Sequence, residues 1–282
     1  MIVCTTPAEM HAACRAHRKF GRSLGLVPTM GALHAGHLSL VSAALAGNDA
    51  VAASIFVNPT QFGPNEDFEA YPRDFDEDCR KLSAAGVSLL FAPTAASMYP
   101  RGNTTYVDPG DIATRLDGAS RPGHFRGVAT IVARLFHIVA PDRAYFGQKD
   151  AAQVAVLRQI VHDLNFPLNL VVCPIVREPD GLAMSSRNRY LSPAERARAL
   201  ILSRALRTAE DLARTGETSA DALRATALAV FAADPETRLD YVAIVDPGTL
   251  LPLDNTSHGA LIAVAAYFGN TRLIDNLLLQ PQ

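Results

Sequence analysis

Two histidines and two glycines, at positions 34, 37, 31 and 36, precede a helix-like apolar pattern over residues 38–46. The first N–H groups of a helix are unpaired and carry partial positive charge, so they attract phosphate. Glycine lets a ligand lie close to the main chain, and imidazoles add donors that titrate near neutral pH. Residues 26–37 therefore predict a strand-to-helix corner that holds a nucleotide triphosphate. The competing interpretation is a corner whose histidines only cap the helix.

Amide side chains follow the next apolar run, over residues 51–57, in the segment Asn58-Pro-Thr-Gln-Phe-Gly63. Asn58 and Gln61 both donate and accept hydrogen bonds, which suits a polar substrate without charge. The alternative is a turn whose backbone is set by Asn58, Pro59 and Gly63.

A third polar group, Phe146-Gly-Gln-Lys-Asp150, again stands between a predicted strand and a predicted helix. We expect Lys149 to meet phosphate and Asp150 to accept from ribose hydroxyls, as acidic groups do in other nucleotide folds. Asp150 also suits the role of a helix N-cap. Gln153, one turn later, is expected to face the same cleft.

The fourth segment, Gly181-Leu-Ala-Met-Ser-Ser-Arg-Asn188, carries two hydroxyls and an arginine on a predicted loop. These groups match a clamp that closes over phosphates. A surface turn with an unrelated arginine is the competing interpretation.

The elements that must position these groups alternate between strand and helix in the first part of the chain. This alternation predicts an α/β fold: a Rossmann-like, doubly wound parallel sheet whose ligands bind beyond the carboxyl ends of the strands. Asp74 and Glu77 predict a capping box, with Phe75, Cys79 and Leu82 on one face of the helix that follows. The expected strands cover residues 23–27, 51–57, 87–91, 144–146 and 168–173, and the expected helices begin near residues 38, 74, 128 and 150.

After about Val176 the pattern changes to that of a smaller α+β domain. Ser192-Pro-Ala-Glu195 predicts a capping box that opens one long helix ending near Thr215. A helix over residues 219–233 and strands over 239–245, 260–267 and 272–279 follow. We assign the arginines at 196, 198, 204 and 207 to a solvated face. The predicted domains are residues 1–175, which hold the nucleotide site, and residues 176–282, which form a lid.

Composition limits the function classes. The chain has 282 residues and a net charge of −2, so it lacks the excess of basic residues that is typical of proteins that bind a nucleic-acid backbone. No apolar run reaches the ~18 residues of a membrane span, and a signal peptide is not recognisable. The four scattered cysteines indicate reduced thiols, so we expect a cytoplasmic protein without membrane or nucleic-acid partners.

Taken in order, the motifs resemble those of the pantothenate synthetase family, the pantoate–β-alanine ligases, nearly end to end. The matching segments are residues 28–37, 58–67, 121–127, 146–150 and 184–188. The first and last are versions of the nucleotide signatures shared with class I aminoacyl-tRNA synthetases and related nucleotidyltransferases. The chain departs from the family at Gln148, often Glu, and at Ala152, where a second glutamine often precedes Gln153.

The resemblance implies that ATP activates (R)-pantoate as pantoyl adenylate, which β-alanine then converts to pantothenate with release of AMP. It implies a homodimer and Mg²⁺ brought with ATP, with the metal's side-chain ligands unknown. The acidic run at 74, 76, 77 and 78 is interpreted as a solvated helix start rather than a magnesium contact. The catalytic residues implied are His37 and His34, and the pantoate and β-alanine contacts are Gln61, Gln153, Asn58 and Arg121. The implied ATP contacts are Met30, Gly31, Ala32, Leu33, His34, Ala35, Gly36, His37, Gly147, Gln148, Lys149, Asp150, Val176, Met184, Ser185, Ser186 and Arg187.

Two other functions compete with this one. A different nucleotidyltransferase with the same histidine chemistry would keep the nucleotide in its product, whereas the ligase releases AMP. A non-catalytic ATP-binding module would need the glycines and cations but not His37 or Gln153.

Overall fold

A computed structural model describes residues 1–19, 21–64 and 66–281, which form two compact units. The first unit comprises Met1–Thr114, Arg121–Gly147 and Val156–Cys173. The second comprises Arg115–Ser120, Gln148–Ala155 and Pro174–Gln282. Two short segments that we expected in the first domain, Arg115–Ser120 and Gln148–Ala155, therefore belong to the second unit. In the described part of the chain, no helix has the length and apolarity needed to cross a membrane.

The first unit is built on a six-stranded sheet in the order β1-β4-β3-β2-β5-β6, with every pair of neighbours parallel. Chain order runs outward from β2 through β3 to β4, and from β5 to β6 on the other side. The β2/β5 pair is therefore the switch point at which ligands bind in such sheets. This architecture confirms the predicted fold class. The strands are β1 (Ile2–Cys4), β2 (Leu24–Thr29), β3 (Ala50–Ile55), β4 (Leu89–Phe91), β5 (Arg143–Gly147) and β6 (Asn169–Cys173).

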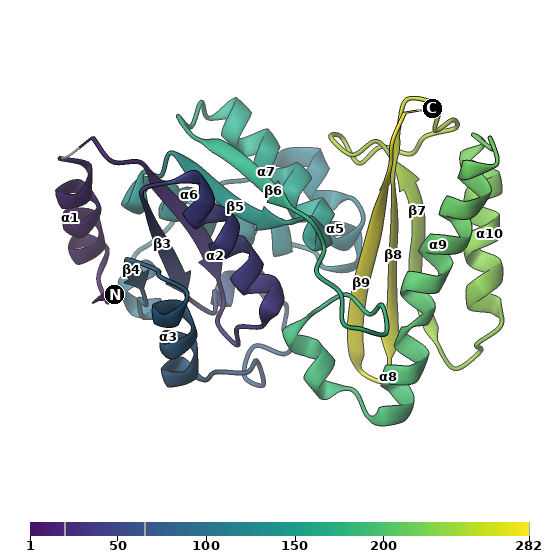
Figure 1. The fold of residues 1–282 in the computed structure, drawn as a ribbon, viewed down its shortest axis with the longest axis horizontal. Coiled ribbons are helices and arrows are strands. Elements are labelled where there is room, and N and C mark those ends of the chain that lie inside the picture. The colour runs from purple at the N-terminus through teal and green to yellow at the C-terminus, as the bar shows by residue number, and fades with distance from the viewer. Residues whose placement is uncertain (20, 65, 282) are drawn as a thin grey trace. The chain divides into compact units, whose positions relative to one another are not determined.

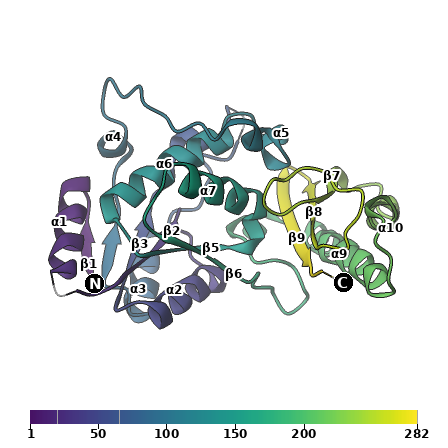
Figure 2. The same cartoon turned by 90° about the horizontal axis from the view of Figure 1, so that it is seen from above.

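Helices cover both faces of this sheet. Figure 2 shows α6 on one face and α2 with α3 on the other. The core between α2 and the sheet is apolar and includes Val27, Leu33, Val41 and Leu90, whose burial fixes the start of α2 beside the end of β2. The helices are α1 (Pro7–Arg18), α2 (Ala35–Gly47), α3 (Phe75–Ala84), α4 (Ala95–Met98), α6 (His124–Val139) and α7 (Ala151–Asp163), with short 3₁₀ turns at Pro59–Gln61 and Gly110–Thr114. The start of α7, up to Ala155, belongs to the second unit.

The second unit contains an antiparallel sheet in the order β7-β8-β9. Helices α9 and α10 run along this sheet (Figure 1) and bury an apolar core that includes Leu202, Leu206, Ile262 and Phe268. Its strands are β7 (Arg238–Val245), β8 (Ala260–Phe268) and β9 (Thr271–Leu279), and its helices are α5 (Asp117–Ser120), α8 (Pro193–Ala199), α9 (Ile201–Arg214) and α10 (Ala220–Ala232), with 3₁₀ turns at Gln148–Asp150 and Ser186–Tyr190.

The prediction of one long helix from Ser192 to Thr215 is wrong. The predicted capping box of Ser192 and Glu195 is present, but α8 ends before Leu200 and α9 begins after it. The backbone N–H of Leu200 bonds to the carbonyl of Arg198, two residues earlier, rather than to the carbonyl four residues earlier. The helical ladder is therefore interrupted there.

Candidate active site

The loop after β2 has an unusual backbone. Gly31 and Ala32 both have positive φ, of 85° and 51°. Thr29 anchors the loop because its hydroxyl donates to the carbonyl of Ser54 at 2.7 Å and accepts from the N–H of Gly31 at 3.1 Å. Glycine accepts such a conformation freely, whereas alanine needs support from its surroundings.

His34 and His37 lie together at the start of α2. His34 is the N-cap: its Nδ1 accepts from the N–H of Gly36 at 3.1 Å, and Nδ1 of His37 accepts from the N–H of His34 at 3.3 Å. The two ring centroids are 4.1 Å apart. The histidines therefore do cap the helix, as the competing interpretation held.

This capping also fixes the chemistry of the rings. An Nδ1 that accepts a hydrogen bond carries no proton, so a neutral ring carries its proton on Nε2. Both imidazoles are thus in the tautomer that donates through Nε2, at the helix end that carries partial positive charge. Capping and hydrogen bonding to phosphate are compatible because they use different ring nitrogens.

The turn after β3 is organised by Asn58, which is only 1% exposed. Its Nδ2 donates to Oε1 of Gln61 at 3.1 Å and to the carbonyl of Gly127 at 3.2 Å. Its Oδ1 accepts from the hydroxyls of Thr60 at 3.0 Å and Tyr99 at 2.7 Å. Both the Nδ2 and the Oδ1 of this buried amide therefore have partners, and one of its hydrogen bonds orients the side chain of Gln61.

Gln61 is the amide that this turn presents. Because Asn58 donates to its Oε1, its Nε2 points the other way, toward Sδ of Met30 at 3.1 Å. The contact joins the first and second predicted motifs at the ends of the neighbouring strands β2 and β3. Asn65, which belongs to the second motif, lies outside the described residues.

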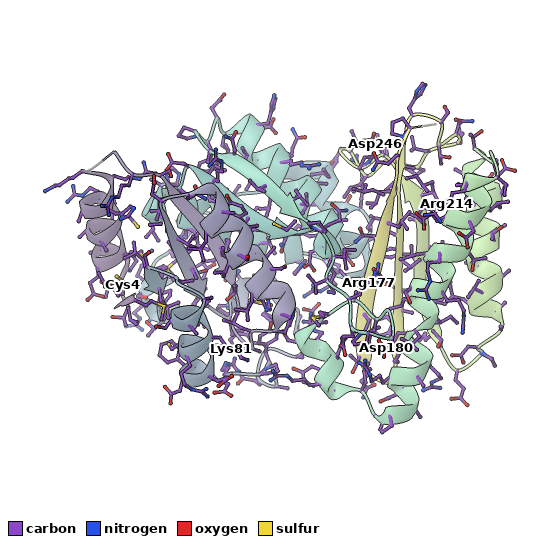
Figure 3. All side chains as sticks on the ribbon, in the orientation of Figure 1. Cys4, Lys81, Arg177, Asp180, Arg214 and Asp246 are labelled. Atoms are coloured by element: carbon purple, nitrogen blue, oxygen red, sulfur yellow. The ribbon has the colours of Figure 1, made fainter. Side chains whose placement is uncertain are left out.

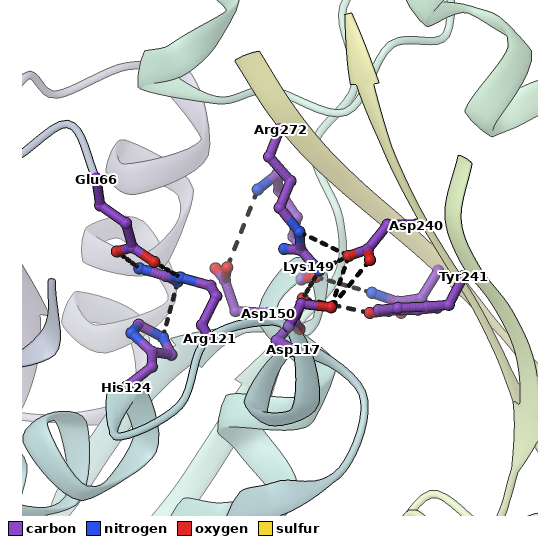
Figure 4. A network of polar contacts seen from close by, with 11 residues as sticks. Glu66, Asp117, Arg121, His124, Lys149, Asp150, Asp240, Tyr241 and Arg272 are labelled. Carbon is purple, nitrogen blue, oxygen red and sulfur yellow. Dashed lines mark hydrogen bonds and ion pairs between the residues drawn. The ribbon is translucent and has the colours of Figure 1, made fainter. Parts of the chain in front are cut away.

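Arg121 forms an ion pair with Glu66. Its guanidinium donates to both carboxylate oxygens of Glu66, at 2.7 and 2.6 Å, and contacts Nε2 of His124 at 3.0 Å (Figure 4). Nδ1 of His124 lies 2.7 Å from the carbonyl oxygen of Gln61. Burial alone would raise the pKa of Glu66, but the hydrogen bonds and charge of Arg121 outweigh burial and lower it. Glu66 and His124 lie within the motif segments 58–67 and 121–127, but residue type alone did not mark either of them as part of the site.

The buried face of α3 also differs from expectation. Phe75 is 45% exposed, whereas Asp78 is 1% exposed, so the assignment of Asp78 to a solvated helix start is wrong. The Asp78 carboxylate accepts from the N–H groups of Ala32 at 2.7 Å and Leu33 at 2.8 Å. Asp74 does cap α3, as predicted, but the Glu77 carboxylate pairs with Arg80 and Lys81 instead of completing the predicted capping box.

In the second unit, the turn Gln148–Asp150 is held by Asn276 of β9. Nδ2 of Asn276 donates to the carbonyls of Gln148 and Lys149 at 3.0 and 2.9 Å, and its Oδ1 accepts from Gln148 Nε2 at 3.0 Å. Nζ of Lys149 lies 4.0 Å from a carboxylate oxygen of Asp150. The Gln148 side chain is thus bound to the sheet. The sequence offered no signal for Asn276, since its partner lies 128 positions earlier in the chain.

The loop before α8 is a hairpin that presents the last motif. The N–H of Met184 bonds to the carbonyl of Val176 at 2.9 Å, and Ser185 caps the Ser186–Tyr190 turn by accepting from the N–H of Arg187 at 3.2 Å. Ser186 is buried. From their positions at strand ends and in this hairpin, we predict that the four motifs surround one ATP.

Ion pairs fasten this hairpin within the second unit. Arg177 makes two hydrogen bonds to the buried carboxylate of Asp275, at 2.6 and 2.9 Å. Arg196 pairs with Glu178 and Asp180, each at 2.7 Å, and Figure 3 labels Arg177 and Asp180. Arg196 and Arg198, which we assigned to a solvated face, are partly exposed and each is paired, Arg198 with Glu236.

The comparisons with known proteins agree with these motifs. A model of the family described as pantoate–β-alanine ligase matches residues 2–278. The chain belongs to this family. A pantothenate synthetase of Koribacter versatilis is 58% identical over 280 residues, which cover 99% of this chain and 96% of that protein. The enzyme of the same name from Moorella thermoacetica is 54% identical over 280 residues, 99% of each chain.

Solved structures of family members are similar over the whole chain. The crystal structure of pantothenate synthetase from Thermus thermophilus has a TM-score of 0.93 and 49% identity, and covers 100% of both chains. The pantoate–β-alanine ligase from Francisella tularensis, complexed with β,γ-ATP and β-alanine, has a TM-score of 0.81 and 35% identity over 99% of this chain and 97% of that one.

Proposed function

We propose that this chain joins (R)-pantoate and β-alanine to form pantothenate at the expense of ATP. The observation that carries the proposal is the pair of Nε2-donating histidines at the start of α2, in a chain of the pantoate–β-alanine ligase family. The ATP analogue and β-alanine bound by the Francisella tularensis relative support two of the three substrates.

The reaction has two steps. A carboxylate oxygen of pantoate attacks the α-phosphorus of ATP, and the bond from that phosphorus to the leaving oxygen of pyrophosphate breaks. The amine nitrogen of β-alanine then attacks the acyl carbon of pantoyl adenylate, loses a proton, and displaces AMP as the acyl C–O bond breaks. Holding the reactants together can contribute about 7–11 kcal/mol to the lowering of the barrier.

The first step brings a carboxylate to a polyanion, so fixed donors near the phosphates are required. His34 and His37 supply Nε2–H donors that need not reorient during the reaction, and His37 is our candidate for donation to the departing pyrophosphate. Gln61 is assigned to pantoate, with its amide oriented by Asn58. Arg121, which is neutralised by Glu66, is assigned to supporting this region rather than to a substrate carboxylate.

The remaining assignments lie at the end of β5 and in the second unit. Gly147 ends β5 and leads into the turn in which Lys149 and Asp150 are assigned to phosphate and ribose. Gln153 is assigned to pantoate, and the backbone at Val176 to the nucleotide. Ser185, Ser186 and Arg187 are assigned to closing over the triphosphate.

Mg²⁺ is assigned to the substrate, as the counter-ion of the triphosphate. In the described ranges 1–19, 21–64 and 66–281, no group of three or more His, Cys, Asp or Glu side chains is arranged to hold a metal ion. Both oxygens of the Asp78 carboxylate are already bonded to backbone N–H groups. Magnesium commonly binds substrate phosphates with few protein ligands. We also propose the homodimer that the resemblance implies and the cytoplasmic location that the cysteines indicate.

An AMP-release assay with each substrate omitted in turn tests the function. We expect AMP only when pantoate, β-alanine and ATP are all present, and pantoate-dependent exchange of pyrophosphate into ATP without β-alanine. Pyrophosphate release with the nucleotide retained in the product would identify a different nucleotidyltransferase. Tight ATP binding without turnover would identify a binding module.

A further inference from the structure

Helix α3 touches the histidine loop through two side chains of opposite charge. Asp78 accepts from the N–H groups of Ala32 and Leu33 at 2.7 and 2.8 Å, and Nζ of Lys81 donates to the carbonyl of Leu33 at 2.8 Å. Residues three apart share one face of a helix, so both reach the same loop. Figure 3 labels Lys81 on this helix. We call Asp78 and Lys81 the loop clamp.

The loop requires such partners. Ala32 and Leu33 are buried, and their N–H groups would be costly to leave unpaired. Ala32 also has a φ of 51°, which a residue with a side chain adopts only where its surroundings impose it. Two charge-assisted hydrogen bonds to one carboxylate impose that conformation.

Gly31 makes room for the clamp. A Cβ at this position would lie 2.9 Å from a carboxylate oxygen of Asp78 and 3.1 Å from Cγ2 of Ile55. The carboxylate therefore packs directly against the glycine, on the protein side of the loop. A buried carboxylate with an N–H group on each oxygen serves the backbone and is poorly placed for a metal or a substrate.

The clamp acts immediately before the catalytic pair. Leu33 is followed by His34, the N-cap of α2, and the His37 ring is bonded to the His34 N–H at 3.3 Å. A displacement of residues 32–33 would carry both imidazoles with it. We propose that Asp78 and Lys81 are positioning residues that hold His34 and His37 in register for adenylate formation. This inference rests on the proposed function and adds residues that do not touch substrate.

The test separates the two half-reactions. In Asp78→Asn, one carboxylate oxygen becomes an NH₂ group, so the N–H of either Ala32 or Leu33 loses its acceptor. Lys81→Met keeps an unbranched side chain but removes the donor to the Leu33 carbonyl. Asp76→Asn, on the exposed side of the same helix, is the matched control, and Lys81→Arg keeps a donor. Step one is followed by pantoate-dependent pyrophosphate exchange, and step two by conversion of supplied pantoyl adenylate with β-alanine.

We expect Asp78→Asn to lower kcat for exchange about 10²-fold, the scale of a 1 Å misplacement, and Lys81→Met about tenfold. Step two should stay within about threefold in both variants, as should every rate of Asp76→Asn and Lys81→Arg.

A folded Asp78→Asn variant with exchange within threefold of the control would overturn the proposal. An equal loss in both steps together with a lower Tm would overturn it as well, because it would indicate a structural role only. Recovery of exchange at high Mg²⁺ would overturn it by marking a metal ligand.

Two further arms keep the test decisive. If Asp78→Asn does not fold, Lys81→Met decides: a selective loss of exchange supports the clamp, and an equal loss in both steps overturns it. If the unaltered chain shows no pantoate-dependent exchange, the proposed function fails independently. Binding of β,γ-methylene ATP then tests the clamp, which is supported by a tenfold weaker Kd in Asp78→Asn and overturned by an unchanged one.

Discussion

Gly127 of α6 lies so close to Thr60 that a Cβ on the glycine would be 2.2 Å from the Thr60 carbonyl oxygen. The Gly127 carbonyl also accepts from Nδ2 of Asn58 at 3.2 Å. Glycine within a helix usually lowers stability relative to alanine. Here it permits the helix to support the turn that presents Gln61.

Gly127→Ala is therefore expected to destabilise the protein by about 1–3 kcal/mol, since the clash is with backbone rather than with a movable side chain. It should also raise KM for pantoate at least tenfold while KM for ATP changes less. Urea unfolding and steady-state kinetics measure both effects. Gly248→Ala, which meets only a side-chain oxygen at 3.5 Å, is the control. Equal changes in the two KM values would contradict a specific link to Gln61.

A second prediction concerns the buried charges of the second unit. Arg272 lies 2.7 Å from carboxylate oxygens of both Asp117 and Asp240, and the hydroxyl of Tyr241 donates to Asp117 at 3.3 Å (Figure 4). Burial and the adjacent charge of Asp117 raise the pKa of Tyr241, which stays neutral.

Arg272→Met should destabilise the protein by about 3–5 kcal/mol, because it leaves two carboxylates without their cation. Arg214→Met, in an exposed pair with Glu210, should cost at most about 0.5 kcal/mol. The free energy of unfolding from denaturant titration measures the difference. Substituting Asp117→Asn in the Arg272→Met background should recover part of the loss, and an additive effect would contradict the coupling.

The sequence was sufficient to predict the parallel sheet apart from its edge strand β1, and the strand ends that carry the motifs. Buried parallel strands and helix starts have local signals, and the order of the elements limits how they wind. The N-terminal helix α1 was missed, although Thr6 and Glu9 form a capping box that local reading can detect. The break at Leu200 could not be read in the same way, since its residues continue the helical pattern.

The side-chain contacts of the candidate site were less predictable. Because Asp78 lies in an acidic run, we expected it in solvent. Its position on α3 instead directs its side chain toward residues 32 and 33, which lie 45–46 positions away in the chain. Arg121 looked available for an anion because Glu66, 55 positions earlier, gives no local sign of pairing with it. Long-range pairing of charges depends on the fold, so residue type alone did not indicate these roles.

The Glu66–Arg121 pair makes stability depend on pH. Folding lowers the pKa of Glu66, so the pair stabilises the folded state at pH values above the ordinary value of about 4.3. This contribution is lost as the pH falls through the lowered pKa. Glu66→Gln should therefore lower the free energy of unfolding by about 2 kcal/mol at pH 7, with the difference shrinking below pH 4. Denaturant titrations of both proteins from pH 7 to pH 3 check this, and a constant difference would contradict it. Asp211→Asn, in an exposed pair with Arg214, is the control.

The last prediction addresses His37 itself. Its Nδ1 completes the cap at His34, and its Nε2 is our donor to the departing pyrophosphate. His37→Ala removes both functions, so it should lower kcat for adenylate formation by about 10²–10⁴ and also lower Tm slightly.

His37→Gln keeps an acceptor that reaches the N-cap N–H, as glutamine does in a capping box. It should restore Tm but not kcat, because its amide does not place a donor where the ring has Nε2. Pyrophosphate exchange and thermal melting on the three proteins separate the roles. Wild-type exchange in the glutamine variant would show that His37 serves the helix cap alone.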